Sequence, residues 1–471
     1  MTQRVSQPSR SLHILRLLKT AVTGEEKEFT TGSINRAIFM LSIPMILEMV
    51  MESLFAVVDV FFVGKLGVDA VATVGLTESM LTIIYSIGIG LSMGATAMVA
   101  RRVGEKNPDA AAHAGMQAIY LALGLSLIIS ALGIFFAKDL LRLMGASTAL
   151  VENNYRYTQI MLVSNIVIML LFMINGIFRG AGDASIAMRS LWLANFLNII
   201  LCPTLIYGVG PIPALGLTGA ALATTIGRGV GVLYQLYHLY KGNGIIRIKA
   251  SHMKLDLPII GNLIRLAAGG TAQFLIASSS WIFLIRILST FGNNALAGYT
   301  IAIRVIVFAI LPAWGMANAA ATLVGQNLGA NQPDRAEKSV WKAAFYNMVF
   351  LGIVTVVFFF GAHWIISIFN NDREVVEMGT LALRIVCLGY IFYAYGMVIS
   401  QSFNGAGDTT TPTILNFFGF WLFQIPLAYI MAIVLKIGPE GVFWAISIAE
   451  SCIAIAAIIL FRRGTWKKVV V

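Results

Sequence analysis

Twelve apolar runs follow one another along almost the whole chain, and they constrain its fold more than any other feature. They lie at 37–64, 71–100, 113–137, 157–179, 187–208, 216–240, 259–290, 296–325, 341–369, 377–403, 412–436 and 441–461. About 20 apolar residues in an α-helix cross roughly 30 Å of hydrocarbon. The short alternating strands of a β-barrel do not appear, so the sequence predicts an all-α integral membrane protein with twelve transmembrane helices.

The composition agrees with a membrane protein. Of the 471 residues, 58% are hydrophobic and only 12% are charged, and the mean hydropathy is +0.82. A soluble chain of this length divides into domains with charged surfaces. The charged residues here are too few to cover such surfaces.

The net charge of +11 indicates topology rather than a nucleic-acid partner. The basic residues cluster before the first run and after runs two, six, eight and twelve, segments that an even number of crossings puts on one side. The loops on the other side carry few basic residues. The positive-inside rule therefore predicts a multi-pass protein of the cell inner (plasma) membrane with both termini in the cytoplasm.

The remaining ends and cysteines carry less information. The first 32 residues are too polar for a signal peptide, and residues 11–22 fit either a basic surface helix or a flexible tail. The three cysteines, Cys202, Cys387 and Cys452, lie in separate apolar runs. Their spacing predicts neither a disulfide framework nor a zinc site.

The second half of the chain repeats the first at a shift of 225 residues. The stretch FRGAGD at 178–183 returns as FNGAGD at 403–408, and Gly104, Pro108 and Asp109 return at 329, 333 and 334. Each half has six spans and enters from the same side, which makes the repeat parallel. We therefore expect five regions: a cytoplasmic N-terminal tail (1–32), an N-lobe (33–240), a cytoplasmic linker (241–258), a C-lobe (259–463) and a cytoplasmic tail (464–471).

The repeated GAGD is typical of a tight turn between the fourth and fifth span of each half. Its glycines permit the turn, and Asp183 or Asp408 can cap the helix that follows. Two membrane halves related by an axis along the membrane normal are the layout of an alternating-access transporter.

Acidic residues occur in apolar runs, where they are energetically unfavourable and need a function or a partner. Glu48, Glu52 and Asp59 have spacings of 4, 7 and 11 residues, which put them on one face of the first helix. They either line a water-filled cavity and take up protons or cations, or pair with buried cations such as Arg304 or Arg286. Two further cavity acids, Glu78 and Glu450, face the same alternatives.

The second half lacks the first-span acids. At the shift of 225, Glu48 corresponds to Gln273, Glu52 to Ala277 and Asp59 to Leu284. This asymmetry indicates that ion chemistry belongs to the N-terminal half, where Asn175, Asn195, Asn198 and Thr224 add neutral oxygens. Such oxygens with an Asp suit Na⁺, whereas the Asp alone suits a proton.

Nothing in the sequence predicts an enzyme or a cofactor. The GxSxG match at 90–94 lies inside an apolar run rather than in a strand–turn–helix. No histidine has a motif around it, and no Walker A lysine motif is present. We therefore predict no catalytic residue, no cofactor and no direct use of ATP.

These features together resemble the MATE family, the multidrug and toxic compound extrusion transporters. The resemblance rests on DVFFVGKLG in the first run, on ARRVGEKNPD and GQNLGANQPD after runs two and eight, and on the paired RGAGD and NGAGD turns. It covers about residues 33–463. It implies two V-shaped six-helix lobes that export cationic, often aromatic compounds in exchange for H⁺ or Na⁺.

The resemblance also implies an ion site in the N-lobe. Its first-span acid matches Asp59, its fourth-span Asn matches Asn175, and its sixth-span Thr matches Thr224. Its fifth-span Asn matches Asn198, but Cys202 replaces the acid or amide that usually follows. A neutral thiol is a poor ligand for Na⁺ and a poor proton carrier. The resemblance is closer to the DinF-like than to the NorM-like branch, because the C-lobe acids of the latter are missing.

The prediction is thus a secondary active exporter of small amphipathic, cationic compounds. We expect contacts with small-molecule substrates and the lipid bilayer, and a monomer, since nothing in the sequence demands an oligomer. One alternative is a flippase for lipid-linked or polyisoprenoid precursors, which would need a strongly cationic cavity. A membrane enzyme or a receptor is a more distant alternative.

Overall fold

The structure is a computed structural model that describes residues 10–24, 29–242 and 244–471, apart from the side chains of residues 10–15, 56, 57, 59 and 60. Throughout these described ranges the regular elements are helices, and the single β-bridge joins Val209 to Ile212 in a loop. The prediction of an all-α fold is confirmed.

The helices follow the repeat. The first half contains α1 (Arg10–Thr23), α2 (Ile34–Val63), α3 (Val68–Gly104), α4 (Pro108–Leu143), α5 (Thr148–Val163), α6 (Asn165–Ala181), α7 (Ala184–Tyr207) and α8 (Leu217–Lys241). The second half contains α9 (Leu257–Leu288), α10 (Asn293–Gly329), α11 (Pro333–Ser367), α12 (Arg373–Leu388), α13 (Tyr390–Ala406), α14 (Thr410–Asn416), α15 (Ile425–Tyr429) and α16 (Pro439–Arg462). The backbone is π-helical at Phe417–Gln424 and Ile430–Val434, so α14 and α15 form one continuous span.

Each of the twelve predicted spans falls on one helix or one run of joined helices, in the predicted order. Ten spans are long and apolar enough to cross a membrane, and the bent pair α12–α13 makes an eleventh. The twelfth is α8, whose 25 residues include Arg228 and Gln235 and which is therefore less apolar. The prediction of twelve transmembrane helices is confirmed.

The fourth span of each half is broken, which the sequence analysis did not predict. The break between α5 and α6 falls at Ser164, and the break between α12 and α13 falls at Gly389, 225 residues later. The bend between α12 and α13 is 57°. The two halves thus share an irregularity as well as their regular elements.

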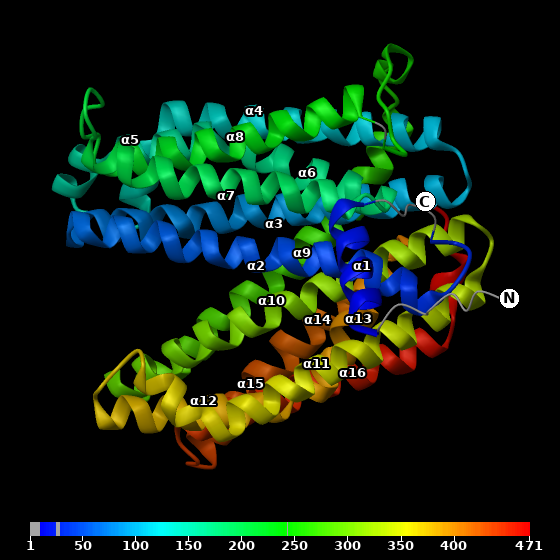
Figure 1. Ribbon diagram of the computed structural model, residues 1–471. Coiled ribbons are helices and arrows are strands. Elements are labelled where there is room, and N and C mark those ends of the chain that lie inside the picture. Colours follow the sequence, from blue (N-terminus) through cyan, green and yellow to red (C-terminus); the bar gives the residue numbers. More distant parts are fainter. Residues whose placement is uncertain (1–9, 25–28, 243) are drawn as a thin grey trace, which may run out of the picture.

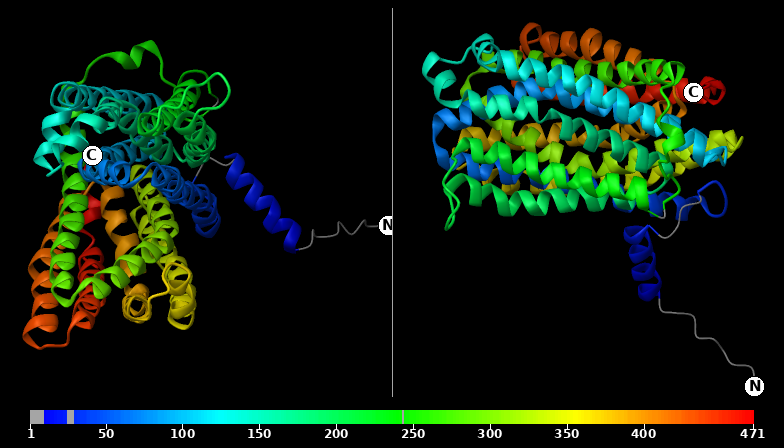
Figure 2. Two further views of the ribbon diagram at one scale, coloured as in Figure 1. Left: turned by 90° about the vertical axis from the view of Figure 1, so that its left-hand side faces the viewer. Right: turned by 90° about the horizontal axis from the view of Figure 1, so that it is seen from above.

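The helices form two lobes, as predicted. Figure 1 shows that the N-lobe (α2–α8) and the C-lobe (α9–α16) meet at the end of the molecule that carries the C-terminus and diverge toward the other end, which gives the molecule a V shape. We call the first end the terminal face and the other the opposite face. The two further views in Figure 2 show the same two bundles, with α1 beside them.

The first helix of each half packs partly on the other lobe. Ile38, Leu41 and Met45 at the start of α2 belong to the hydrophobic core of the C-lobe. Leu263 and Leu266 at the start of α9 belong to the core of the N-lobe. This reciprocal exchange buries apolar surface of both helices where the lobes meet.

The two GAGD turns have the same geometry. Gly182 and Gly407 adopt φ of 86° and 90°, a left-handed conformation that glycine adopts without steric strain. The following Asp183 and Asp408 donate main-chain hydrogen bonds of 2.9 Å to residues five positions earlier, which ends the helix. The Asp408 side chain also accepts from the main-chain N of Thr411 at 3.0 Å, as expected of a helix cap.

Each GAGD turn also accepts a hydrogen bond from a side chain of the other lobe. Gln326 at the end of α10 donates to the main-chain oxygen of Gly180 at 3.0 Å. Arg101 at the end of α3 donates to that of Ala406 at 3.1 Å. Residues 101 and 326 are repeat equivalents, so the repeated motif forms a nearly symmetric contact between the lobes.

The ends of α3 and α10 cross at this contact, which we call the seam. A Cβ on Gly104 would lie 2.0 Å from the main-chain oxygen of Gln326, and one on Gly329 would lie 2.1 Å from that of Arg101. Real Cβ atoms do not approach so closely, so only glycine allows the lobes to meet as they do. Gly104 and Gly329 are again 225 residues apart, so the repeat axis passes through the seam.

Segments outside the spans cover the terminal face. Trp466 is fully buried and stacks on Phe461 with ring centroids 4.6 Å apart. Lys467 forms an ion pair with Glu337 at 2.5 Å, and this hydrogen bond raises the pKa of the Lys467 ammonium group. Arg101 reaches across from the N-lobe to the main-chain oxygen of Val469 at 2.9 Å. Residues 464–471 therefore lie at the seam and contact both lobes.

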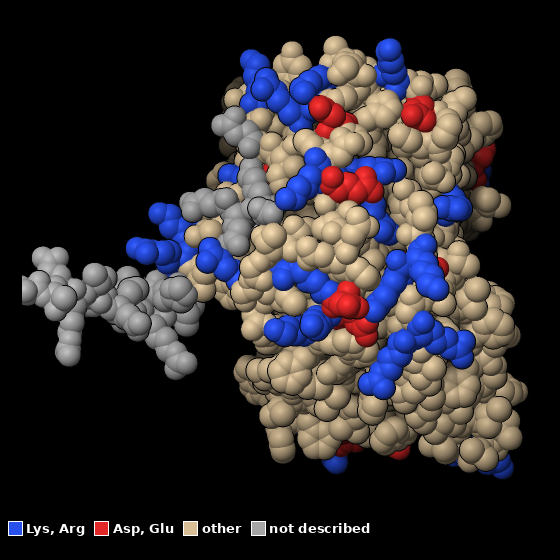
Figure 3. Space-filling model, turned by 90° about the vertical axis from the view of Figure 1, so that its right-hand side faces the viewer, with Lys and Arg blue, Asp and Glu red and all other residues tan. Residues whose placement is uncertain are grey.

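The segment between the lobes follows α4. Gln117 of α4 donates to the main-chain oxygen of Lys254 at 2.8 Å. His113 Nδ1, also on α4, lies 3.1 Å from the main-chain oxygen of His252. Lysine and arginine side chains gather on the terminal face around a few acids (Figure 3). This is the distribution that the loop charges predict.

Candidate functional site

The first helix of the N-lobe carries two acids that each pair with an arginine of a neighbouring helix. Glu48 is only 2% exposed. Its Oε1 accepts from Asn175 Nδ2 at 3.1 Å and lies 3.4 Å from Arg179 Nη1. Its Oε2 is buried without a hydrogen-bond partner. Asn175 and Arg179 both lie on α6, one turn apart, so they reach the carboxylate together.

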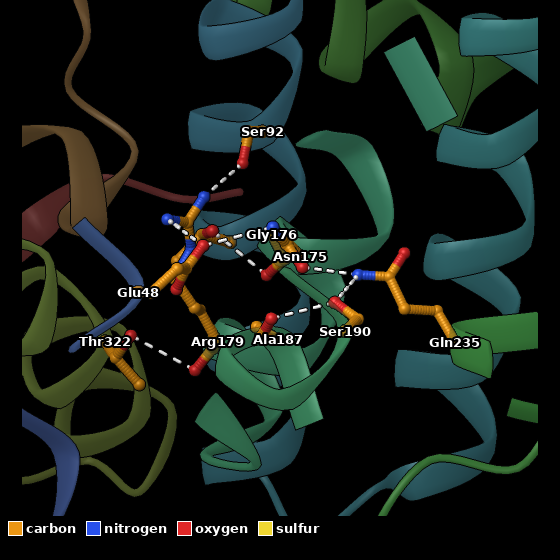
Figure 4. Close-up of polar contacts among 10 residues, drawn as sticks. Glu48, Ser92, Asn175, Gly176, Arg179, Ala187, Ser190, Gln235 and Thr322 are labelled. Atoms are coloured by element: carbon orange, nitrogen blue, oxygen red, sulfur yellow. Dashed lines mark hydrogen bonds and ion pairs between the residues drawn. The ribbon is translucent and has the colours of Figure 1, made fainter. Parts of the chain in front are cut away.

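A network of neutral side chains holds this pair in place (Figure 4). Arg179 Nη2 donates to Ser92 Oγ of α3 at 2.7 Å. Gln235 of α8 donates to the Asn175 side-chain oxygen and to Ser190 Oγ of α7 at 2.8 Å. The network therefore joins α2 to four other helices of the N-lobe.

The network also touches the C-lobe. Thr322 Oγ1 of α10 donates to the main-chain oxygen of Arg179 at 3.1 Å. The next residue, Gly180, accepts from Gln326. Gly180 itself packs against α3, where an added Cβ would lie 2.7 Å from the main-chain oxygen of Thr96. The Glu48–Arg179 ion pair is thus one residue away from the seam.

The second pair lies one turn along α2. Arg228 Nη2 of α8 is 3.0 Å from Glu52 Oε1, and its guanidinium lies over the rings of Phe55 at 4.6 Å and Tyr85 at 5.8 Å. Arg228 is 2% exposed, whereas the Glu52 side chain is 27% exposed. Ring faces and a carboxylate both attract a guanidinium, which explains how it is accommodated in an apolar lobe.

These contacts show the pairing of two of the acids in this conformation. Glu48 and Glu52 pair with buried cations, but the partners are Arg179 and Arg228 and not the suggested Arg304 or Arg286. The sequence held a signal for these partners that was missed. At the shift of 225, Arg179 corresponds to Asn404 and Arg228 to Ile453, so both arginines, like both acids, occur in the first half alone.

The C-lobe has a neutral counterpart of the first pair. Gln273 and Asn404, the repeat equivalents of Glu48 and Arg179, exchange two hydrogen bonds of 3.0 and 3.1 Å. Gln273 also donates to the main-chain oxygen of Thr409 at 3.1 Å. Both halves therefore tie their first span to their fourth span at the same place, with charges in the N-lobe and with amides in the C-lobe.

The predicted ion-site residues are only partly brought together. Asn198 Nδ2 donates to Thr224 Oγ1 at 3.3 Å, and Asn198 Oδ1 is buried without a partner. Asn175 instead contacts Gln235, which lies 11 residues from Thr224 and hence about 16 Å along α8. Among the described side chains of the predicted site, Asn198 and Thr224 are in contact, whereas Asn175 belongs to the Glu48 network.

The side chain of Asp59 lies outside the described part of the structure, and only its helix, α2, is placed. Contacts between α2 and α7 join Met51 to Asn195 and Phe62 to Tyr207. They put residue 59 level with residues 203–204 of α7. Cys202 is fully buried there in the N-lobe core.

The two remaining acids lie elsewhere. Glu78 is exposed on α3 and interacts electrostatically with Arg304 of the C-lobe. Glu450 is half-buried on α16, near Tyr393 of α13. The structure therefore does not join them to the α2 acids. Among the side chains that the structure describes, which do not include that of Asp59, no three His, Cys, Asp or Glu form a group that could hold a metal ion.

The fold and this site define a class: a polytopic membrane protein with two parallel six-helix lobes that join at one end, and with two acid–arginine pairs inside the N-lobe. The sequence profile of the MatE family matches residues 44–204 and 271–430, which is more than half of the chain. The chain belongs to the MatE family. This is a family of transporters, so the prediction that the protein is not an enzyme is confirmed.

Individual relatives agree with this assignment. The "Probable multidrug resistance protein YoeA" of Bacillus subtilis (strain 168) is 26% identical over 440 residues, which cover 93% of this chain and 95% of that protein. A solved MATE structure in complex with MaL6 is 28% identical, covers 93% of this chain and 98% of its own, and has a TM-score of 0.88. The outward-facing conformation of a multidrug resistance MATE family transporter of the MOP superfamily is 28% identical, covers 94% and 98%, and has a TM-score of 0.87. The closer likeness to the DinF-like branch stays a prediction.

Proposed function

We propose that this protein is a secondary active exporter of small amphipathic, cationic compounds, driven by entry of H⁺ or Na⁺ across the inner membrane. The observation that carries this proposal is the way the lobes meet: they join through a glycine seam at the terminal face and diverge at the opposite face. A contact of this kind can open and close as the lobes rock, which gives alternating access to the space between them.

The charges on the two faces support an orientation. Basic side chains gather on the terminal face, and the cytoplasmic side of membrane proteins carries an excess of lysine and arginine. We therefore assign the terminal face and both termini to the cytoplasm. The conformation described here is then closed toward the cytoplasm and open toward the outside, like the outward-facing relative.

The ion pairs favour export over the flippase alternative. A flippase for lipid-linked precursors requires a strongly cationic cavity, but Arg179 and Arg228 are each balanced by a glutamate. The same pairing leaves Glu48 and Glu52 without net negative charge for a cationic substrate. The expected preference for cations therefore rests on Asp59 and Glu78.

We assign ion coupling to Asp59, with Asn198 and Thr224 as further oxygen ligands. The unpartnered Oδ1 of Asn198 is an oxygen that can receive a hard cation or the proton of a carboxyl group. Cys202, level with residue 59, supplies neither. The coupling group is thus one carboxylate with neutral oxygens around it.

The test is ethidium efflux from proteoliposomes with an imposed pH or Na⁺ gradient. For Asp59→Asn we expect gradient-driven efflux to fall to the level of protein-free liposomes while ethidium binding persists, because the amide cannot exchange a charge with the gradient. Asp69→Asn, an exposed acid at the start of α3, is the matched control and keeps its efflux.

Two outcomes contradict the proposal. Efflux by Asp59→Asn at the wild-type rate would remove this residue from coupling. Absence of wild-type ethidium efflux under both gradients would contradict export of cations and revive the flippase alternative.

A further inference from the structure

The Glu48–Arg179 ion pair is buried and in contact with the seam, and the proposed coupling at Asp59 does not use it. Oε1 of Glu48 accepts from Asn175 and pairs with Arg179, whereas its buried Oε2 has no hydrogen-bond partner. Arg179 is 9% exposed and its main-chain oxygen is held by Thr322 of the other lobe. A change of charge at Glu48 therefore acts, through Arg179, on the contact between the lobes.

The charged and titratable groups around Glu48 are few. Arg179 faces it from α6. Glu52 lies one turn away on its own helix, paired with Arg228 of α8. The side chains that α3, α7 and α10 contribute to the described network, Ser92, Ser190 and Thr322, are neutral. Arg179 is thus the immediate counter-charge of Glu48.

We propose that Glu48 is a second proton-binding residue of the transport cycle, and that Arg179 converts its protonation into opening of the cytoplasmic seam. This inference rests on the proposed function, which it extends from the coupling ion to the gate. The proton binds at Oε2, so that Glu48 becomes a neutral carboxylic acid and Arg179 loses its counter-charge.

An unpaired guanidinium in this position destabilises the closed seam, because breaking a buried ion pair leaves an uncompensated charge out of water. Opening the seam lets water reach Arg179 and removes that penalty. When water on the cytoplasmic side takes the proton from Glu48, the ion pair forms again and the seam closes. One proton then crosses for each opening, in the direction that an antiporter requires.

The neighbouring guanidinium also selects the ion. A Na⁺ ion at Oε2 would lie within a few ångströms of a positive charge in a region of low dielectric constant, which is strongly unfavourable. A proton instead forms a covalent O–H bond to the carboxylate. The proton reaches Glu48 along α2, where Glu52 lies about 6 Å and residue 59 about 16 Å closer to the opposite face.

The C-lobe provides the design for the test. Glu48→Gln alone leaves Arg179 without a counter-charge, as protonation does. Glu48→Gln with Arg179→Asn copies the Gln273–Asn404 pair, which already ties the same two spans in the other half. The double variant therefore retains a hydrogen bond between the first and fourth spans, but neither position 48 nor position 179 can titrate.

The measurement is the distance between spin labels on Lys241→Cys of α8 and Lys338→Cys of α11, two exposed positions. The labelled protein carries Cys452→Ser and is studied in lipid nanodiscs between pH 5 and pH 9. Wild type is expected to show a growing population of longer distances as the pH falls. Glu48→Gln is expected to show the longer distances at every pH, and the double variant the shorter ones at every pH. Both variants are expected to lose ethidium efflux driven by a pH gradient.

The outcomes separate this inference from the proposed function, because the label distance needs no substrate. A pH response in Glu48→Gln equal to that of wild type would overturn the inference even if ethidium is exported. If Glu48→Gln does not fold, a pH response retained in the double variant overturns it in the same way. A wild-type distance that ignores pH while a Na⁺ gradient drives efflux also overturns it and leaves the proposed function standing. A pH-dependent distance without ethidium efflux supports the gate and contradicts only the proposed substrate.

Discussion

Alanine at Gly104 or Gly329 is expected to reduce the population of the closed seam by about 5- to 150-fold, since overpacking typically costs about 1–3 kcal/mol and each 1.4 kcal/mol is a factor of ten. The added Cβ meets a main-chain oxygen of the other lobe at 2.0 or 2.1 Å. That oxygen belongs to a helix and cannot move aside as a flexible side chain can. The lobes must therefore separate at the terminal face, while each lobe keeps its own core.

The label pair on α8 and α11 measures this effect, and ethidium efflux should fall with the closed population. Gly75→Ala is the matched control, because Gly75 lies on α3 as well and has nothing within 4 Å of its Cβ position. Unchanged distances in both Gly104→Ala and Gly329→Ala would show that the seam does not depend on glycine contact.

Glu52→Gln is expected to lower the free energy of unfolding by up to about 3–5 kcal/mol, because it removes a carboxylate that pairs at 3.0 Å with the buried guanidinium of Arg228. Arg228→Met is expected to lower it less, since the Glu52 side chain is 27% exposed and can reach water. The double variant should be more stable than Glu52→Gln alone. Replacing both members of a buried pair by apolar or neutral groups removes the desolvation penalty together with the attraction.

Unfolding in an SDS titration, followed by circular dichroism, gives these three values. Arg373→Met and Glu377→Gln form the control pair, because their ion pair is exposed and exposed pairs contribute little. A double variant less stable than either single variant would contradict this account of the pair. In that case the destabilisation would come from lost packing around Phe55 and Tyr85 rather than from the loss of the Glu52 carboxylate.

The helices could be predicted from the sequence because each transmembrane span is a continuous apolar run that needs no partner to be recognised. The 225-residue repeat then fixed the pairing of elements between the halves. The breaks at Ser164 and Gly389 were missed, because neither interrupts the apolar pattern and a single serine or glycine does not end a helix. The meeting of the GAGD turns across the lobes was also missed, since a turn motif predicts a local conformation and not its distant partner.

The acids Glu48 and Glu52 could be singled out from the sequence, but their arginine partners could not. Glu48 and Glu52 stand out because acids in apolar runs are rare. Arg179 sits beside the GAGD turn and was treated as part of that motif, and Arg228 lies in the least apolar span. The pairing of an acid with a particular arginine depends on which helices are neighbours. The repeat alone does not determine this, although the absence of both acids and both arginines from the second half indicates that they belong together.

The central claim is that transport requires the seam at the terminal face to open. A disulfide between Gly94→Cys of α3 and Leu266→Cys of α9 tests it most directly, because it would tie α3 to the C-lobe helix whose start packs on the N-lobe core where the lobes meet. The Cβ position of residue 94 lies 3.2 Å from the Cβ of residue 266, close to disulfide geometry. In liposomes under the gradient that drives the wild type, oxidation should abolish ethidium efflux and reduction should restore it. Efflux at the wild-type rate with the disulfide fully formed would contradict the account, because the lobes would then export their substrate without separating at this end.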